Sequence, residues 1–258
     1  MPKIHPTAIV DEKAKLADDV VVDAFAVIHA DVEIGKGSYI GPHAVIYDGA
    51  RLGENVKIYQ GASVSNVPQD LKFGNEKTFF YIGNNTQIRE FVTLHRGTNE
   101  TGFSRIGENC LIMAYAHVAH DCIIGDNVIL ANGVQVAGHV FIDDYAIIGG
   151  MTPIHQFSTV GKHVMVGGGL RLNLDVPPFV IAARDPLKYE GLNVIGLRRR
   201  GFSNERISAL KEAYKILFFS GLTIKQGAEK LKEEFPDNND VAEIISFLEK
   251  SKRGIIKR

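Results

Sequence analysis

Residues 106–136 read IGENCLIMAYAHVAHDCIIGDNVILANGVQV, and every sixth residue from Ile106 onward is aliphatic. The residue four positions after each aliphatic residue is small or slim, as at Cys110, Ala116 and Cys122. A six-residue period with one large and one small inward residue fits a short strand followed by a tight corner, stacked into a parallel β-helix. One repeat cannot bury its aliphatic side chain alone, so the stability of this fold must come from stacking.

The same period covers most of the chain. Its aliphatic positions are Ile4, Val10, Leu16, Val22, Ile28, Ile34, Ile40, Ile46, Leu52, Ile58, Val64, Ile82, Ile88, Leu94, Ile106, Ile112, Val118, Ile124, Leu130, Val136, Ile142, Ile148, Ile154, Val160 and Val166. Glycine and asparagine between these positions supply the corners. Two loop insertions, near residues 66–80 and 99–105, leave the phase intact. These repeats predict a β-helix over residues 1–185.

A second domain is predicted over residues 186–258. The period ends after Val166, and the prolines at 177, 178 and 186 mark a change of architecture because proline cannot serve a central ladder. Helical spacing of apolar residues then predicts three helices: one from the N-cap Ser203 to Ser220-Gly221, one over Leu222–Phe235, and one over Val241–Lys252. The predicted fold class is mainly β, a parallel β-helix of hexapeptide repeats followed by a C-terminal α-helical domain.

Composition excludes several classes of function. The chain has 258 residues and a formal net charge of −1, which gives no electrostatic footprint for nucleic acid. The N-terminus lacks the apolar run of a signal peptide, and no stretch approaches the roughly 20 apolar residues of a transmembrane segment. We therefore expect a cytoplasmic protein. Cys110 and Cys122 both occupy the small inward position, which favours buried, reduced thiols over a disulfide.

Four of the nine histidines gather in one part of the array: His117, His120, His139 and His155. If three hexapeptides form one coil, residues eighteen apart stack on neighbouring coils. His120 then lies beside Gly138, and Gly138 lies beside Gln156. Because adjacent strands are about 4.8 Å apart, three coils bring these imidazoles within about 10 Å along one corner. This convergence predicts a functional site.

Histidine is suited to proton transfer at such a site. Its unperturbed pKa lets it take up a proton near neutral pH and return it later. A base at His120 would have the amide of Gly138 on the adjacent coil, where a developing oxyanion could be met. The absence of a side chain at Gly138 would let a reacting carbonyl approach that amide closely.

Several motifs in this order resemble one family, the UDP-N-acetylglucosamine acyltransferases of lipid A synthesis. They are Gln69-Asp70-Leu71-Lys72, Leu94-His95-Arg96-Gly97-Thr98, Ala116-His117-Val118-Ala119-His120-Asp121-Cys122, Ala137-Gly138-His139-Val140, Ile154-His155-Gln156-Phe157, Asp175-Val176-Pro177-Pro178 and Gly196-Leu197-Arg198-Arg199-Arg200-Gly201. The resemblance covers nearly the whole chain, and these motifs are far more specific than the repeat alone.

The resemblance implies a left-handed parallel β-helix and a homotrimer with active sites between subunits. It implies transfer of a (3R)-3-hydroxyacyl group from acyl carrier protein to the 3-hydroxyl of UDP-N-acetylglucosamine, the first step of lipid A biosynthesis. No cofactor of its own is expected, because the acyl group is carried on the phosphopantetheine of acyl carrier protein. No covalent acyl-enzyme is required.

The resemblance also assigns roles to residues. His120 is the general base, the N–H of Gly138 faces the thioester oxyanion, and Asp121 is a candidate to support the base, although successive residues of a strand point to opposite faces. The expected substrate-binding residues are Asp70, Lys72, His117, His139, His155 and Gln156, with Asn193, Arg199 and Arg200 at the nucleotide end. Gly168 matches the acyl-chain ruler, and its missing side chain predicts a long donor chain. The chain departs from the family pattern at Ile195, where an acidic residue is expected, and in the apolar run Leu170–Leu174.

Basic residues near the second domain suggest how the acyl donor is attracted. Arg198, Arg199 and Arg200, with Arg206, Lys211 and Lys215 beyond them, would draw in an acidic carrier protein and accelerate encounter.

Other readings of the sequence remain open. A histidine base would equally serve a UDP-sugar with a 3-amino group, or an acetyl-CoA-dependent hexapeptide transferase. A zinc protein resembling the gamma carbonic anhydrases would use His117, His120 and His139 as ligands. The long helical tail and the arginine cluster argue against zinc, and the histidine cluster argues against a purely structural β-helix.

Overall fold

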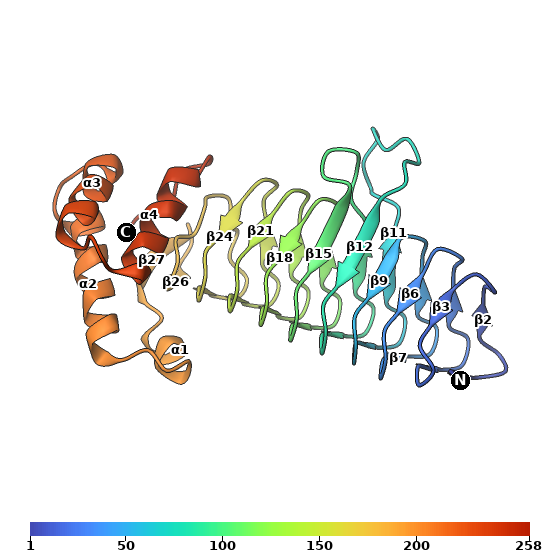
Figure 1. Ribbon diagram of the computed structural model, residues 1–258. Helices are drawn as coiled ribbons and strands as arrows, with labels where there is room; N and C mark the ends of the chain where they lie inside the picture. The colour runs from blue at the N-terminus through green and yellow to red at the C-terminus, as the bar shows by residue number, and fades with distance from the viewer.

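The computed structural model describes residues 1–258 and contains three sheets of short strands that run along the sides of a prism (Figure 1). The first sheet contains, in spatial order, β1 (Lys3–Ile4), β4 (Val21–Val22), β7 (Tyr39–Ile40), β10 (Lys57–Ile58), β13 (Gln87–Ile88), β16 (Leu111–Ile112), β19 (Ile129–Leu130), β22 (Ile147–Ile148), β25 (Met165–Val166), β26 (Val180–Ala183) and β27 (Lys188–Leu192). The second contains β2 (Ile9–Val10), β5 (Val27–Ile28), β8 (Val45–Ile46), β11 (Ser63–Asn66), β14 (Thr93–His95), β17 (His117–Val118), β20 (Gln135–Val136) and β23 (Pro153–Ile154). The third contains β3 (Lys15–Leu16), β6 (Glu33–Ile34), β9 (Ala50–Leu52), β12 (Phe79–Ile82), β15 (Phe103–Ile106), β18 (Ile123–Ile124), β21 (Phe141–Ile142) and β24 (Thr159–Val160).

Three successive strands make one coil, as the hexapeptide period predicts. Ile123 pairs with Phe141 and His117 with Gln135, so the undisturbed register between coils is eighteen residues. From Val22 onward every aliphatic repeat position is at most 5% exposed and belongs to one continuous core. Ile4 remains 43% exposed because the first coil has a neighbour on one side only.

The corners are built from left-handed backbone. Many non-glycine residues at these corners have φ near +60°, among them Phe25, Asn55, Asp121, His139 and Phe157. This conformation is uncommon for residues with a side chain, so its repetition shows that the coil geometry imposes it. The conformation also directs corner side chains outward, where residues eighteen apart stack on one another, as His139 and Phe157 do.

Two excursions leave the array at the predicted interruptions. The first runs between the end of β11 at Asn66 and the start of β12 at Phe79, and the second between the end of β14 at His95 and the start of β15 at Phe103. Figure 1 shows both loops rising from the same side of the prism, and the amide of Asn99 donates to Glu76 across them (3.2 Å). The excursions therefore form one contiguous structure above the coils.

The C-terminal part begins with a hairpin and continues as helices. The strands β26 and β27 pair antiparallel around the cis Asp185–Pro186 bond, so the first sheet extends past residue 185 to Leu192. The helices are α1 (Val194–Arg199), α2 (Asn204–Phe219), α3 (Ile224–Glu234) and α4 (Asn239–Lys250). Ser203 caps α2 as expected, and only the short α1 has no counterpart among the predicted helices.

Two buried polar contacts join the helices to the last coils. The hydroxyl of Tyr214, in α2, donates to the carbonyl of Pro178 (2.5 Å) in a fully buried position. Asp175 accepts from the Thr159 amide (2.8 Å) through one oxygen and from the Ser251 hydroxyl (2.6 Å) through the other. None of the helices combines the length and the apolar composition that a membrane-spanning segment requires. Cys110 and Cys122 are buried and unpaired, as expected, and burial raises their thiol pKa values to about 11 and about 12.

Candidate active site

His120 lies directly over Gly138 of the next coil, as the eighteen-residue stacking predicts. A β-carbon added to Gly138 would lie 2.7 Å from Cε1 and 2.8 Å from Nε2 of His120, so the imidazole occupies the space that any side chain would fill. The N–H of Gly138 donates to no group of the chain. The glycine thus serves a purpose that the sequence did not reveal: it accommodates the histidine ring, with a free amide beside it.

Asp121 lies at the corner and points to the same side as His120. Its φ of +59° turns the chain at this residue, so the alternation of side chains along a strand does not apply. One carboxylate oxygen lies 2.7 Å from Nδ1 of His120. Successive residues of a strand face opposite sides, but Asp121 lies in the corner that comes after the strand. The expectation that His120 and Asp121 face opposite sides is therefore wrong.

The carboxylate of Asp121 is held in place by the second excursion. Its Oδ1 accepts hydrogen bonds from the Thr98 amide (2.8 Å) and the Thr101 hydroxyl, and its Oδ2 accepts from the Thr98 hydroxyl (2.9 Å). Burial by itself raises the pKa of Asp121, but the hydrogen bonds from Thr101, His120 and Thr98 outweigh burial and hold that pKa below its ordinary value. An ionised carboxylate only accepts, so Nδ1 of His120 must donate to it. Nε2 of the neutral ring is then left with its lone pair, as a general base requires.

Two further histidines lie beside His120 on its own coil and the one before. Nδ1 of His117 lies 2.8 Å from the hydroxyl of Thr93, and its ring meets that of His95 edge to face at 5.1 Å. Burial, with the nearby His95 and His120, lowers the pKa of His117 to about 4, and burial also lowers that of His95. Both rings are neutral near pH 7, so they offer hydrogen-bonding groups without adding positive charge next to the base.

His139 completes the cluster from the following coil. Its ring meets that of His120 edge to face at 5.1 Å and stacks on Phe157 at 4.7 Å. Nε2 of His139 lies 3.6 Å from a carboxylate oxygen of Asp121 and 3.6 Å from one of Glu100. The structure thus brings His117, His120, Asp121, Gly138 and His139 together.

His155 and Gln156 lie one coil further along, and their side chains make no hydrogen bond to this cluster within the chain. His155 is exposed, and its Nδ1 lies 2.9 Å from the carbonyl of Gln156. Gln156 is half-buried, next to Phe157, whose amide donates to the carbonyl of Gly138 (3.2 Å). Both residues therefore lie on the same corner as the cluster, on the coil that stacks on Gly138.

The remaining predicted residues lie in two other places. Asp70 and Lys72 are on the first excursion, where the Lys72 amide donates to Asp70 (2.9 Å) and the Lys72 side chain is exposed. Asn193 is buried and caps α1 by accepting from the Gly196 amide (3.1 Å) while donating to the carbonyl of His163 (3.0 Å). Arg200 has its guanidinium 4.2 Å above the ring of Tyr145.

Three other positions singled out in the sequence have clear surroundings. Arg199 is exposed at the end of α1, and Ile195 is 68% exposed on the same helix. Gly168 is exposed between two glycines, and a β-carbon there would lie 3.1 Å from the carbonyl of Gly150. A side chain at 168 would therefore start against the backbone of the neighbouring coil.

Four residues around the site did not appear among the predicted site residues: His95, Thr98, Glu100 and Thr101. All four lie in or next to the second excursion. Because this insertion interrupts the eighteen-residue register, coil stacking gives no indication of which corner it faces. The motif Leu94–Thr98 was the available signal, since it places a histidine and a threonine at the start of the insertion.

A metal site would use a different set from the three histidines considered above. The side chains of His120, Asp121 and His139 bring potential ligand atoms within 4.8 Å of one another, whereas Nδ1 of His117 is engaged with Thr93. The carboxylate of Asp121 already accepts four hydrogen bonds, which fills its lone-pair positions. A metal ion would have to displace one of these bonds, so the surroundings suit acid–base chemistry better than metal binding.

A parallel β-helix with a histidine–carboxylate pair at a coil corner defines the class of hexapeptide-repeat transferases. The bacterial transferase hexapeptide family model matches residues 13–48, 31–66 and 103–138, and the model described as UDP N-acetylglucosamine O-acyltransferase, domain 2, matches residues 175–256. The chain is 51% identical over 262 residues to the acyl-(acyl-carrier-protein)–UDP-N-acetylglucosamine O-acyltransferase of Burkholderia orbicola, and 50% identical over 258 residues to that of Thiobacillus denitrificans; both alignments cover all of both chains.

Solved structures agree with the sequence comparison. The enzyme of this family from Acinetobacter baumannii superposes with a TM-score of 0.95 at 44% identity, covering 98% of this chain and 99% of that one. The UDP-N-acetylglucosamine acyltransferase of Francisella novicida superposes with a TM-score of 0.96 at 38% identity, covering 99% and 94%. The chain belongs to the UDP-N-acetylglucosamine O-acyltransferase family, and the predicted left-handed β-helix with C-terminal helices is confirmed.

Proposed function

We propose that this protein transfers a (3R)-3-hydroxyacyl group from acyl carrier protein to the 3-hydroxyl of UDP-N-acetylglucosamine, the first step of lipid A biosynthesis. The observation that carries the proposal is the His120–Asp121 pair above the free amide of Gly138, in a chain about half identical over its full length to enzymes named for this reaction. The acyl group arrives on the carrier's phosphopantetheine, so the protein needs no cofactor of its own.

The chemistry follows from the positions of three groups. Nε2 of His120 takes the proton of the sugar 3-hydroxyl as its oxygen attacks the thioester carbonyl, and Asp121 stabilises the imidazolium that forms. The N–H of Gly138 donates to the oxyanion. When the tetrahedral intermediate collapses, the carbon–sulfur bond breaks and His120 returns the proton to the departing thiolate. The ester and a free phosphopantetheine thiol are the products, with no acyl-enzyme.

Substrate binding is proposed to involve more than one subunit. Asp70 and Lys72 lie on the first excursion, and Asn193, Arg199 and Arg200 lie near α1; neither group contacts the histidine cluster within one chain. In a homotrimer, these residues of one subunit would reach the histidine corner of another, with His117, His139, His155 and Gln156 lining the site.

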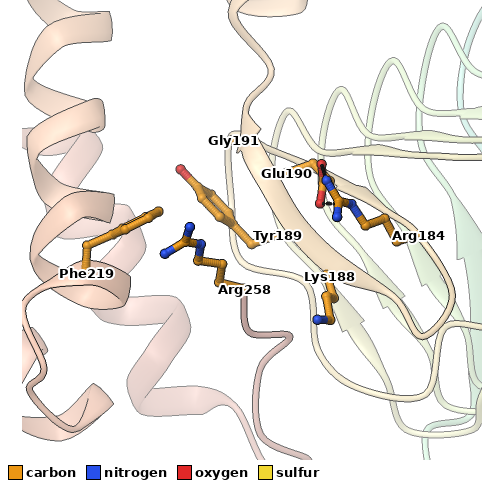
Figure 2. Close-up of a pocket in the computed structure, with 7 residues that line it drawn as sticks. All are labelled: Arg184, Lys188, Tyr189, Glu190, Gly191, Phe219 and Arg258. Carbon is orange, nitrogen blue, oxygen red and sulfur yellow. Dashed lines mark hydrogen bonds and ion pairs between the residues drawn. The ribbon is translucent and has the colours of Figure 1, made fainter.

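The helical part offers a basic surface for an acidic carrier. A cavity of about 600 Å³ lies between β27, the end of α2 and the C-terminus, and Lys188 and Arg258 are among its lining residues (Figure 2). Figure 2 shows Arg184 paired with Glu190, whereas Lys188 and Arg258 have no acidic side-chain partner. An adjoining cavity adds Lys211 and Lys215. Two of the basic residues are already paired: Lys215 lies 3.4 Å from Glu212, and Arg206 donates two hydrogen bonds to Asp240 (2.8 and 2.7 Å).

Incubation of the purified protein with UDP-N-acetylglucosamine and 3-hydroxyacyl carrier proteins, followed by mass spectrometry, tests the proposal. A UDP-3-O-acyl product is expected. Product only with a UDP-3-amino sugar would identify an N-acyltransferase instead. Absence of product from a folded sample, together with stoichiometric bound zinc, would overturn the transferase assignment.

A further inference from the structure

Arg96 is a half-buried cation without an acidic partner. It lies directly after β14, where the second excursion begins, and its hydrogen-bond acceptors are backbone carbonyls, not carboxylates. Its Nη1 donates instead to the carbonyls of Asp48 (3.1 Å) and Ser65 (3.4 Å), and its buried Nε has no acceptor. Burying a guanidinium without an ion pair is a costly arrangement, which the more distant carboxylates of Asp48, Glu76 and Asp31 only partly offset. The second excursion thus begins at a cation that no side-chain carboxylate contacts directly.

The guanidinium of Arg96 contacts the first excursion by lying against an aromatic ring. Its Cζ lies 5.5 Å from the centre of the Phe73 ring. The amide of Phe73 donates to the carbonyl of Asp70 (3.0 Å), and the amide of Lys72 donates to the Asp70 side chain (2.9 Å). The amide of Phe73 therefore closes the turn that contains Asp70 and Lys72. The guanidinium of Arg96 packs against the ring of the same Phe73.

The tip of this excursion has few other anchors. Leu71 is fully exposed, and Lys72 points into solvent, so no apolar core fixes the turn. The other tether is Glu76, which accepts from the amides of Gly74 (2.6 Å) and Asn99 (3.2 Å) near the base of the loop. A segment with so few buried contacts is expected to open locally when one anchor is lost.

We propose that Arg96 is a positioning residue that fixes the 67–78 loop, and through Phe73 presents Asp70 and Lys72 to the nucleotide sugar; this rests on the function proposed above. Arginine suits the task because its planar group can donate to two carbonyls and lie over a ring at once, whereas lysine offers a single point charge.

Arg96→Lys keeps the charge and removes the planar group that lies against Phe73, so it is the variant to test. We expect the KM for UDP-N-acetylglucosamine to rise about tenfold, while kcat and the KM for the acyl donor stay within about twofold, because only acceptor positioning is lost. Arg89→Lys is the matched control. Arg89 lies 4.3 Å over the ring of Tyr59 and pairs with Glu90, remote from the loop, so this variant should match the wild type.

Two additional measurements separate positioning from general stability and from the proposed function. Hydrogen exchange of the Lys72 and Phe73 amides should accelerate about tenfold in Arg96→Lys while the coil amides stay protected. In a Lys72→Ala background, Arg96→Lys should raise the KM no further.

An unchanged KM together with unchanged loop exchange would overturn the role of Arg96, as would a loss confined to kcat. If the wild type forms no product, the proposed function fails, and the exchange experiment still decides whether Arg96 fixes the loop.

Discussion

The carboxylate of Asp121 accepts a hydrogen bond from Nδ1 of His120, its neighbour in the chain, at 2.7 Å. Adjacent residues rarely meet in this way, and here the left-handed φ of Asp121 allows it. The second excursion then locks the carboxylate with Thr98 and Thr101. The base is therefore oriented by a contact that depends on both the corner and the loop.

Replacing His120 with alanine should abolish turnover. General-base catalysis contributes about 10²- to 10⁴-fold, so kcat is expected to fall by at least about two orders of magnitude. The unfolding midpoint and the affinity for UDP-N-acetylglucosamine should change little. His43→Asn is the control, because His43 is an exposed corner residue with φ of +57° far from the site, and asparagine tolerates that backbone. A near-normal rate in His120→Ala would refute the base assignment.

Asp121→Asn tests the orienting role. Asparagine accepts a positive φ, so the fold should survive, but the neutral amide no longer fixes the His120 tautomer or stabilises its cation. We expect kcat to fall by about 10²-fold. The measurement is a pH–rate profile of kcat. A rate within twofold of wild type would show that the hydrogen bond is structural only.

Acidification should remove the stability that the Asp121 carboxylate provides. Its pKa is lower in the folded state than its ordinary value of 3.8, so its contribution is present above about pH 4 and is lost as the pH falls through the lower folded value. The difference in unfolding midpoint between wild type and Asp121→Asn, measured in urea, should therefore shrink below about pH 4. A difference that grows on acidification would contradict the assigned direction.

Gly138→Ala should impair catalysis by displacing the ring above it. The new β-carbon would lie 2.7 Å from Cε1 of His120, closer than any normal contact. We expect kcat to fall by about 10²-fold, since a shift of about 1 Å can have that effect. In a His120→Ala background the same substitution should have little further effect, because its target ring is gone. Equal losses in both backgrounds would mean that the glycine acts independently of the histidine.

His163 should limit stability in mild acid. Its ring stacks between Tyr145 and Phe179, and its buried Nδ1 has no partner. Burial, reinforced by Arg200 and Lys162, lowers its pKa to about 4. The unfolded histidine takes up a proton near pH 6.5 and the folded one does not, so stability present above about pH 6.5 is lost as the pH falls toward 4.

His163→Phe should remove this sensitivity. The stack is kept, and phenylalanine already occupies positive-φ corners at Phe25 and Phe91. The free energy of unfolding of the variant minus that of the wild type, measured in urea, should be up to about 2 kcal/mol larger at pH 5 than at pH 7.5. Parallel pH dependence of the two proteins would show that another group governs acid sensitivity.

Gly168 is expected to permit a long acyl donor. Donors of fourteen or sixteen carbons should react faster than a ten-carbon donor, and Gly168→Met should reverse that order because its side chain occupies the space that the missing side chain leaves beside the neighbouring coil. The measurement is kcat/KM across a series of 3-hydroxyacyl carrier proteins. Faster transfer of the ten-carbon chain by the wild type would refute the ruler assignment.

Much of the site could be predicted from the repeat. Once three hexapeptides are taken as a coil, the stacking of His120 on Gly138 follows from their separation of eighteen residues, and the structure confirms it. The support of Asp121 by Thr98 and Thr101 could not be predicted, because the second excursion adds residues outside the register. The hairpin of β26 and β27 and the short α1 were missed for a similar reason, since neither continues the six-residue period.

The β-helix, the register between its coils and the corner at which the histidines gather could all be read from the amino-acid sequence, because each hexapeptide repeats the same local signal of one large and one small inward residue. The three-dimensional packing was needed to show that Asp121 turns toward His120, that the two excursions meet above that corner, and that Arg96 contacts Phe73. These contacts join segments of different register or depend on the backbone φ of a single residue, and neither property is expressed in a periodic pattern.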